Sequence, residues 1–119
     1  MLFTAPDESC WVGVLRLALR VPGSRSLKEK RKPIAQIRDR LRSRQNLSVA
    51  EIGHLEDHSR SVLAIAMVAN DKRFIQSTLD RIIHDVGSWR GAFIEDASIT
   101  VERPGDASLE SQYDEWKKD

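Results

Sequence analysis

The sequence predicts an α+β domain whose elements follow the order strand, helix, strand, strand, helix, strand. Some segments carry apolar residues at every second position, as strands do, and others carry them at every third or fourth position, as helices do. A Pro-Gly pair ends the first of these segments, and another follows the last. The chain has 119 residues, of which 40% are hydrophobic and 31% are charged. These values are typical of one globular domain and exclude a disordered chain.

The first strand is expected over residues 11–21, because its leucines alternate with shorter or charged side chains. The pair Pro22-Gly23 suits a type II turn and ends this strand. A helix should follow as far as about residue 44. Its buried stripe has the spacing i, i+3, i+7. The stripe consists of Ile34, Ile37 and Leu41.

The start of this helix has two interpretations. Ser26 is a good N-cap, and Glu29 three residues later completes a capping box. Pro33 would then lie inside the helix, where it removes one hydrogen bond. Alternatively, the regular helix begins near Lys32, and Pro33 occupies its first turn. We expect a kinked or two-stage start.

The remaining elements follow in order. Strands are predicted over residues 47–52 and 61–70, and the polar segment 53–60 joins them as a hairpin loop. Asn70 or Asp71 should cap a second helix, which Gly87 should end. A last strand with alternating residues follows over 97–101.

Two crossover helices and one central hairpin predict a ferredoxin-like βαββαβ sandwich, in which both helices cover one face of a four-stranded antiparallel sheet. We divide the chain into an N-terminal extension (1–10), this domain (11–103) and an acidic C-terminal tail (104–119). The tail has the apolar spacing of a short helix, at Leu109, Tyr113 and Trp116.

The face of the sheet away from the helices should be covered. Residues 62–69 are all apolar, and a strand of this kind is usually buried on both faces. Either a second copy of the chain or the C-terminal tail could cover it, which predicts a homodimer or a tail-covered monomer. The residues expected on this open face are Val12, Val14, Ala64, Ala66 and Val68.

Charge is divided unevenly along the chain. The formal net charge is only +1, which excludes a globally basic nucleic-acid binder. Residues 16–44 nevertheless contain eleven Lys and Arg residues against two acidic ones, so this stretch carries +9 and the rest of the chain −8. Such a patch attracts polyanions at low salt.

The first helix is therefore a candidate anion-binding site, because its N-terminal N–H groups and dipole also favour an anion. RNA-recognition domains of this topology stack bases on aromatic residues of the central strands, but residues 61–69 contain none. We therefore expect contacts with RNA phosphates. The residues expected to make them are Arg25, Lys28, Lys30, Arg31, Lys32, Arg38 and Arg42.

No pattern of catalytic or cofactor-binding residues stands out. The glycine-rich nucleotide-binding motifs and a Ser, His and acid arrangement are not found, so we expect neither an enzyme nor a cofactor. His54, Glu56, Asp57 and His58 are possible metal ligands, but nothing in the sequence fixes their directions, and we assign no metal.

A single cysteine, Cys10, excludes an intrachain disulfide. Residues 1–10 have no signal-peptide pattern, and no apolar run is long enough to span a membrane. Together with the single cysteine, these observations favour a cytoplasmic protein outside the membrane.

Several stretches of the chain are distinctive. In the first third these are Val12-Gly13-Val14-Leu15-Arg16-Leu17, Pro22-Gly23 and Ser26-Leu27-Lys28-Glu29-Lys30-Arg31. Later ones are Val49-Ala50-Glu51, Arg60 and Asn70-Asp71-Lys72-Arg73-Phe74. Together they resemble the YlxP-like bacterial proteins, which are grouped as domain-of-unknown-function family 503. The similarity covers about residues 11–103.

The resemblance implies a ferredoxin-like fold and no established activity. Genes of this family often lie near those of a translation initiation factor and a ribosome maturation factor, which implies a role around the ribosome or its RNA. The chain departs from the family pattern at Pro33, where an aliphatic residue is more usual, and in the loop 53–59.

We therefore expect a non-catalytic accessory protein that binds structured RNA or a ribosomal subunit through its basic first helix, in ribosome maturation or translation. The alternative is a homodimeric interaction module that binds an acidic protein and no nucleic acid. A third possibility is an effector-binding or enzymatic domain, which a bound phosphorylated metabolite or a stoichiometric metal in the purified protein would indicate.

Overall fold

The structure is a computed structural model that describes residues 7–104. Within these residues, the helices and strands follow the predicted order. They are β1 (Trp11–Arg20), α1 (Leu27–Arg42), β2 (Ser48–Gly53), β3 (Arg60–Ala69), α2 (Lys72–Ser88) and β4 (Phe93–Glu102). None of these helices is long and apolar enough to cross a membrane. The helix proposed for the C-terminal tail, and any covering of the sheet by that tail, lie outside the described residues.

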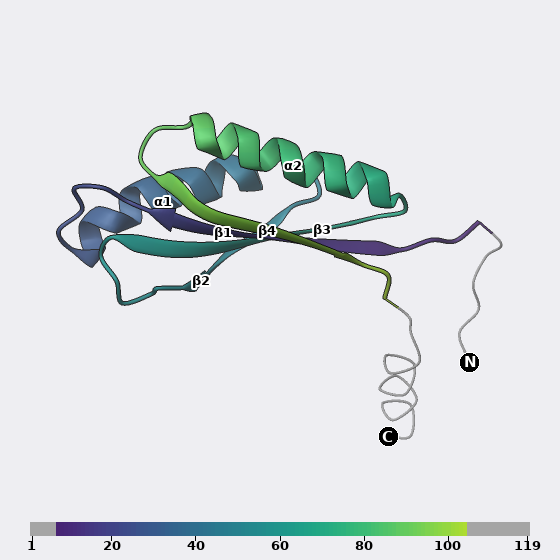
Figure 1. Cartoon of the computed structure of the whole chain (residues 1–119), viewed down its shortest axis with the longest axis horizontal. Helices are drawn as coiled ribbons and strands as arrows, with labels where there is room; N and C mark the ends of the chain where they lie inside the picture. Colours follow the sequence, from purple (N-terminus) through teal and green to yellow (C-terminus); the bar gives the residue numbers. More distant parts are fainter. Residues whose placement is uncertain (1–6, 105–119) are drawn as a thin grey trace, which may run out of the picture.

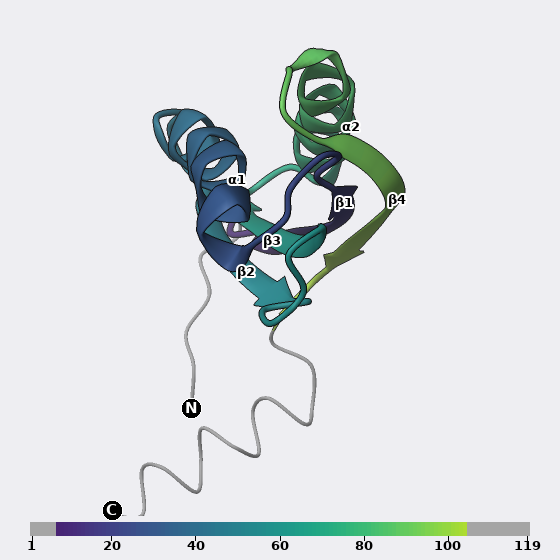
Figure 2. The same ribbon diagram turned by 90° about the vertical axis from the view of Figure 1, so that its left-hand side faces the viewer.

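The strands form one antiparallel sheet in the order β2-β3-β1-β4. Both helices lie on the same side of this sheet, as Figures 1 and 2 show from two directions. This arrangement confirms the ferredoxin-like βαββαβ prediction. The edge strands are β2 and β4, and β4 carries a bulge opposite Ala18 and Leu19 of β1.

The core lies between the sheet and the two helices. Alternate residues of β1 and β3 point into it, and Leu15 and Ile65, which pair across the strands, are fully buried. Each helix buries one stripe of side chains, as its spacing predicts. These stripes include Ile34, Ile37 and Leu41 on α1, and Ile75, Leu79, Ile82 and Val86 on α2.

Helix α1 is continuous from Leu27 to Arg42, so the alternative of a separate turn before a helix that begins near Lys32 is wrong. Ser26 is its N-cap, and the Ser26 Oγ accepts a hydrogen bond of 3.1 Å from the backbone N–H of Glu29. The Glu29 carboxylate in turn accepts one from the N–H of Arg25. Pro33 lies inside a continuous helix, because these caps and the buried stripe compensate for the one helical hydrogen bond that proline removes.

Helix α2 begins where predicted and ends later. The Asp71 side chain accepts from the N–H groups of Arg73 and Phe74, which identifies Asp71 as the N-cap. The prediction that Gly87 ends the helix is wrong, since the helix continues to Ser88. The chain reverses instead at Gly91, whose φ of 108° is a backbone conformation that L side chains rarely adopt.

Gly13 lets α2 approach β1 closely. A Cβ added at this position would lie 2.2 Å from the Cγ2 of Ile75 and 3.0 Å from the Cδ1 of Leu79. Both of these side chains are fully buried and cannot move without disturbing the core.

We expect the variant Gly13→Ala to lose about 1–3 kcal/mol of unfolding free energy, because the extra methyl overpacks the core. Gly87→Ala is the matched control, since a Cβ there would meet only the Cδ1 of Ile94 at 3.8 Å. Alanine should stabilise that helical position by about 0.5–1 kcal/mol. Urea unfolding followed by circular dichroism measures both, and a loss at position 87 with none at position 13 would contradict this packing.

Candidate nucleic-acid interface

A line of cations runs along one flank of α1. At 100° per residue, the positions of Lys28, Arg31, Arg38 and Arg42 fall within about 80° of one another around the helix axis. This flank faces β2, because the Arg42 guanidinium donates a hydrogen bond of 2.7 Å to the Val49 carbonyl. We call these four residues the basic stripe.

Several of the cations on α1 have no partner among the residues that the structure describes. Within residues 7–104, the side chains of Lys28, Arg31 and Lys32 make no hydrogen bond or ion pair, and all three are exposed. Arg38 forms only a surface ion pair of 3.3 Å with its neighbour Asp39, and such pairs contribute little. The side chain of Arg25, just before the N-cap, is exposed as well. These charges are available to an external anion.

Lys30 does not belong to this surface, and its inclusion among the anion-binding residues is wrong. Its side chain is 4% exposed. The ammonium group donates to the carbonyls of His54 at 2.9 Å and Arg60 at 3.0 Å. It also lies 3.4 Å from the Glu51 carboxylate, which accepts a further hydrogen bond from the Ser61 hydroxyl. A phosphate on the surface cannot reach it.

The sequence carries a signal for the burial of Lys30. Lys30, Ile34, Ile37 and Leu41 have the spacing i, i+4, i+7, i+11, so the lysine continues the apolar stripe by one turn. A lysine in such a stripe is buried when carbonyls or a carboxylate surround its amine. Here the two ends of the β2–β3 loop supply the carbonyls.

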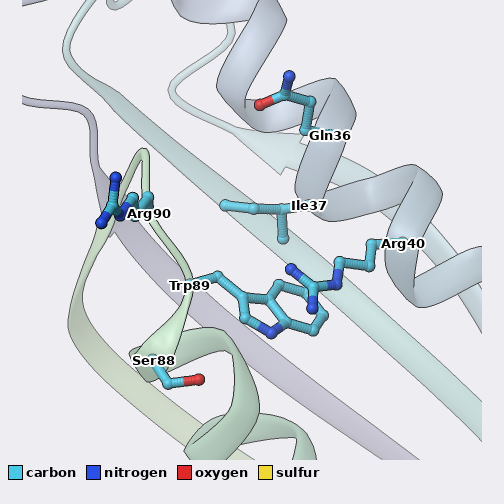
Figure 3. Close-up of a pocket in the computed structure, with 6 residues that line it drawn as sticks. All are labelled: Gln36, Ile37, Arg40, Ser88, Trp89 and Arg90. Carbon is cyan, nitrogen blue, oxygen red and sulfur yellow. The ribbon is translucent and has the colours of Figure 1, made fainter.

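A hollow of about 590 Å³ lies on the opposite flank of α1, between this helix and the end of α2 (Figure 3). The Arg40 guanidinium carbon lies 4.1 Å from the centre of the Trp89 ring. The half-buried ring of Trp89 contacts the core and also lines the hollow. No motif in the sequence indicates this site. Its lining consists of Gln36, Ile37, Arg40, Ser88, Trp89 and Arg90.

A second arginine flanks the same ring and is already paired. The Arg44 guanidinium carbon is 5.6 Å from the centre of the Trp89 ring, and its Nη2 lies 2.7 Å from the Asp85 carboxylate. The hydrogen bond from Arg44 holds the pKa of Asp85 below its ordinary value. Asp85 therefore stays ionised at neutral pH, and this ion pair fixes Arg44.

The open face of the sheet carries the five residues expected there. The cross-strand pairs Val12–Val68 and Val14–Ala66 lie side by side, and Ala64 continues the row opposite Arg16. Val14 is 38% exposed and Val68 51% exposed, because neither helix covers this face. The other half of the face is charged. It carries the ion pairs Arg16–Asp96 and Arg60–Glu95, each at 3.4 Å.

The family model described as "Protein of unknown function (DUF503)" matches residues 12–99. The chain belongs to this family. No curated protein matches it. Among solved structures, the chain is similar to "De novo designed protein Foldit4", with 14% sequence identity and a TM-score of 0.45. That alignment covers 82% of this chain and 99% of the designed one.

In this DUF503 chain, two of the four possible metal ligands in the β2–β3 loop, Asp57 and His58, bond to the backbone or to a nearby hydroxyl group. The Asp57 carboxylate accepts from the N–H and the hydroxyl of Ser59, and these bonds lower the pKa of Asp57. The Nδ1 of His58 lies 2.9 Å from the Ser24 carbonyl. In residues 7–104, no three His, Cys, Asp or Glu side chains are grouped so that they could hold a metal ion.

We expect Lys30→Ala to destabilise the DUF503 chain by about 3 kcal/mol or more, because Glu51 and two carbonyls lose the partner that compensates their burial. Lys32→Ala removes the same charge from an exposed position and should change stability by less than about 0.5 kcal/mol. Urea unfolding compares the two variants. Equal stability of both would show that the buried amine contributes nothing to the fold.

Proposed function

We propose that this DUF503 chain is a non-catalytic, cytoplasmic RNA-binding protein that acts in ribosome maturation or translation. In this proposal, the basic stripe and the neighbouring Arg25 and Lys32 bind the phosphates of structured RNA. The alignment of four cations on one flank of α1 is the observation that carries the proposal.

The length and chemistry of the stripe suit a nucleic-acid backbone. From Lys28 to Arg42 the helix rises about 21 Å, which is long enough to meet several phosphates in succession. Contacts of this kind position a protein without reading sequence, and double-stranded RNA is recognised mostly by its shape and its backbone. The proposed partner is therefore folded ribosomal RNA, free or in a subunit, rather than a defined single-stranded sequence. The gene neighbourhood implied by the family resemblance supports the same partner.

The test measures binding of a 20-base-pair RNA duplex by fluorescence anisotropy between 50 and 300 mM salt. We expect Lys28→Ala/Arg31→Ala to weaken binding by about tenfold at low salt. Each lost phosphate contact should also reduce the slope of log K against log salt by about 0.7–0.9. The matched control is Arg73→Ala/Arg81→Ala, which removes two exposed charges from α2. An equal loss in the two double variants would refute the role of the stripe.

The exposed valines of the open face favour a second candidate function, a homodimeric interaction module that binds an acidic protein through α1. The occupant of the face would be a second copy of this chain. Two sheets pack about 10 Å apart through small, interdigitating side chains. The row of Val12, Val14, Ala66 and Val68 provides such a surface, and the charged residues beside it would form the rim.

In this second candidate, light scattering of the purified protein should give the mass of a dimer. Val14→Lys should convert it to a monomer with an unchanged circular dichroism spectrum, because the new charge lies in the centre of the face. Gln76→Lys adds the same charge to an exposed position on α2 and should leave the dimer intact. A wild-type protein that is monomeric at 100 μM would exclude this candidate.

A further inference from the structure

The hollow between α1 and α2 combines a stacking surface with hydrogen-bond donors that have no acceptor in the described part of the chain. Within residues 7–104, the side chains of Gln36, Arg40 and Arg90 make no hydrogen bond or ion pair. The floor contains Ile37, which is 3% exposed, and the half-buried ring of Trp89. Figure 3 shows that Arg40 extends from α1 towards this ring, while Arg90 lies on the connection to β4.

The charge of the hollow favours an anion. None of its six lining residues is acidic. The C-terminal end of α2 contributes about half a negative charge, against the two guanidinium groups of Arg40 and Arg90. The carboxylates of Asp39 and Asp85, which lie within three residues of lining residues in the sequence, are paired with Arg38 and Arg44. The side chains that line the hollow therefore carry a net positive charge.

The stack of Arg40 on Trp89 favours an anion that also carries a flat ring. A guanidinium that lies over an aromatic ring keeps its N–H donors in its own plane, so it can stack and bind phosphate together. Nucleobases stack on aromatic rings and on arginine planes in this way. A volume of about 590 Å³ is within the usual range for a small-molecule site. One nucleotide has both a base, which can stack on this pair, and a phosphate, which can pair with the cations.

We propose that this hollow binds one unpaired nucleotide of the RNA. Its base stacks on the free face of the Arg40 guanidinium, whose other face covers Trp89, and its phosphate lies at the rim, where the long, exposed side chain of Arg90 can turn to meet it. The proposal rests on the RNA binding proposed above and adds a second contact to it. Lys32 lies on the outward ridge of α1, one turn before Gln36, and so connects the basic stripe with the hollow. An RNA that crosses α1 would thus meet phosphate contacts on one flank and a base site on the other.

The test uses two 20-base-pair RNA duplexes that differ only by one bulged adenosine. We expect the wild-type protein to bind the bulged duplex about tenfold more tightly, because stacking of the free base adds to the phosphate contacts. Arg90→Ala and Trp89→Leu should remove this preference and leave binding of the plain duplex unchanged. Trp89→Phe, which keeps a ring, should restore part of it.

Two controls separate this site from the basic stripe and from loss of folding. Trp11→Leu removes the other half-buried tryptophan among residues 7–104, which also lies near two cations, and it should retain the preference. Lys28→Ala/Arg31→Ala should weaken both duplexes equally. Arg90 is exposed, so its replacement tests the site without disturbing the core.

Each outcome decides the proposal. Equal affinity of the wild type for both duplexes overturns the nucleotide site and leaves the proposed RNA binding intact. If neither duplex binds, the proposed function fails, and titration of adenosine monophosphate against tryptophan fluorescence decides the site alone. Saturable quenching that Arg90→Ala abolishes would then assign the hollow to a free nucleotide. No quenching would overturn the site as well.

Discussion

The ammonium group of Lys30, buried between α1 and the base of the β2–β3 hairpin, constrains the whole surface of the first helix. Burial of a charge is unfavourable unless it is fully paired, so α1 has one rotation at which two carbonyls and Glu51 surround the amine. A helix is rigid at this length, and that rotation therefore fixes the direction of every other side chain on it. The basic stripe faces β2, and Gln36 and Arg40 face α2, because Lys30 faces the sheet.

This constraint gives the two flanks of α1 different chemistry. The flank beside β2 presents cations at intervals along the helix, which suits the repeating phosphates of an RNA backbone. The flank beside α2 presents a ring, a stacked guanidinium and an amide around a hollow. In RNA-recognition domains of the same topology, the aromatic residues lie on the sheet. In this chain β3 has none, and Trp89, which the unpaired Arg40 guanidinium covers, lies in the helical layer. The proposed RNA contacts therefore belong to the helical side of the molecule.

The fold could be predicted from the sequence because its signals are local. Alternation in β1, the stripes of both helices and the capping residues each depend on neighbours within one or two turns. The parts that could not be predicted depend on contacts between distant residues. The local pattern indicates that Lys30 is buried, but it does not indicate its partners, Glu51 and the loop carbonyls, which are more than twenty residues away. The contact between Trp89 and Arg40 likewise joins residues that are distant in sequence. The sequence predicts only residues 97–101 of the last strand, whereas β4 begins at Phe93. The bulge at Glu95 interrupts the alternation that identifies a strand, so the first residues of β4 have no clear pattern.

The same bulge bears on how copies of the chain can meet. As an edge strand of ten residues, β4 presents backbone donors and acceptors that another strand could extend into a continuous sheet. The bulge bends this edge and shifts its register between Asp96 and Ile94. Two such edges brought together would therefore not match in register. A bulge on an edge strand is a feature that opposes edge-to-edge pairing of two copies, so the long outer strand of this sheet is a poor template for a second β4.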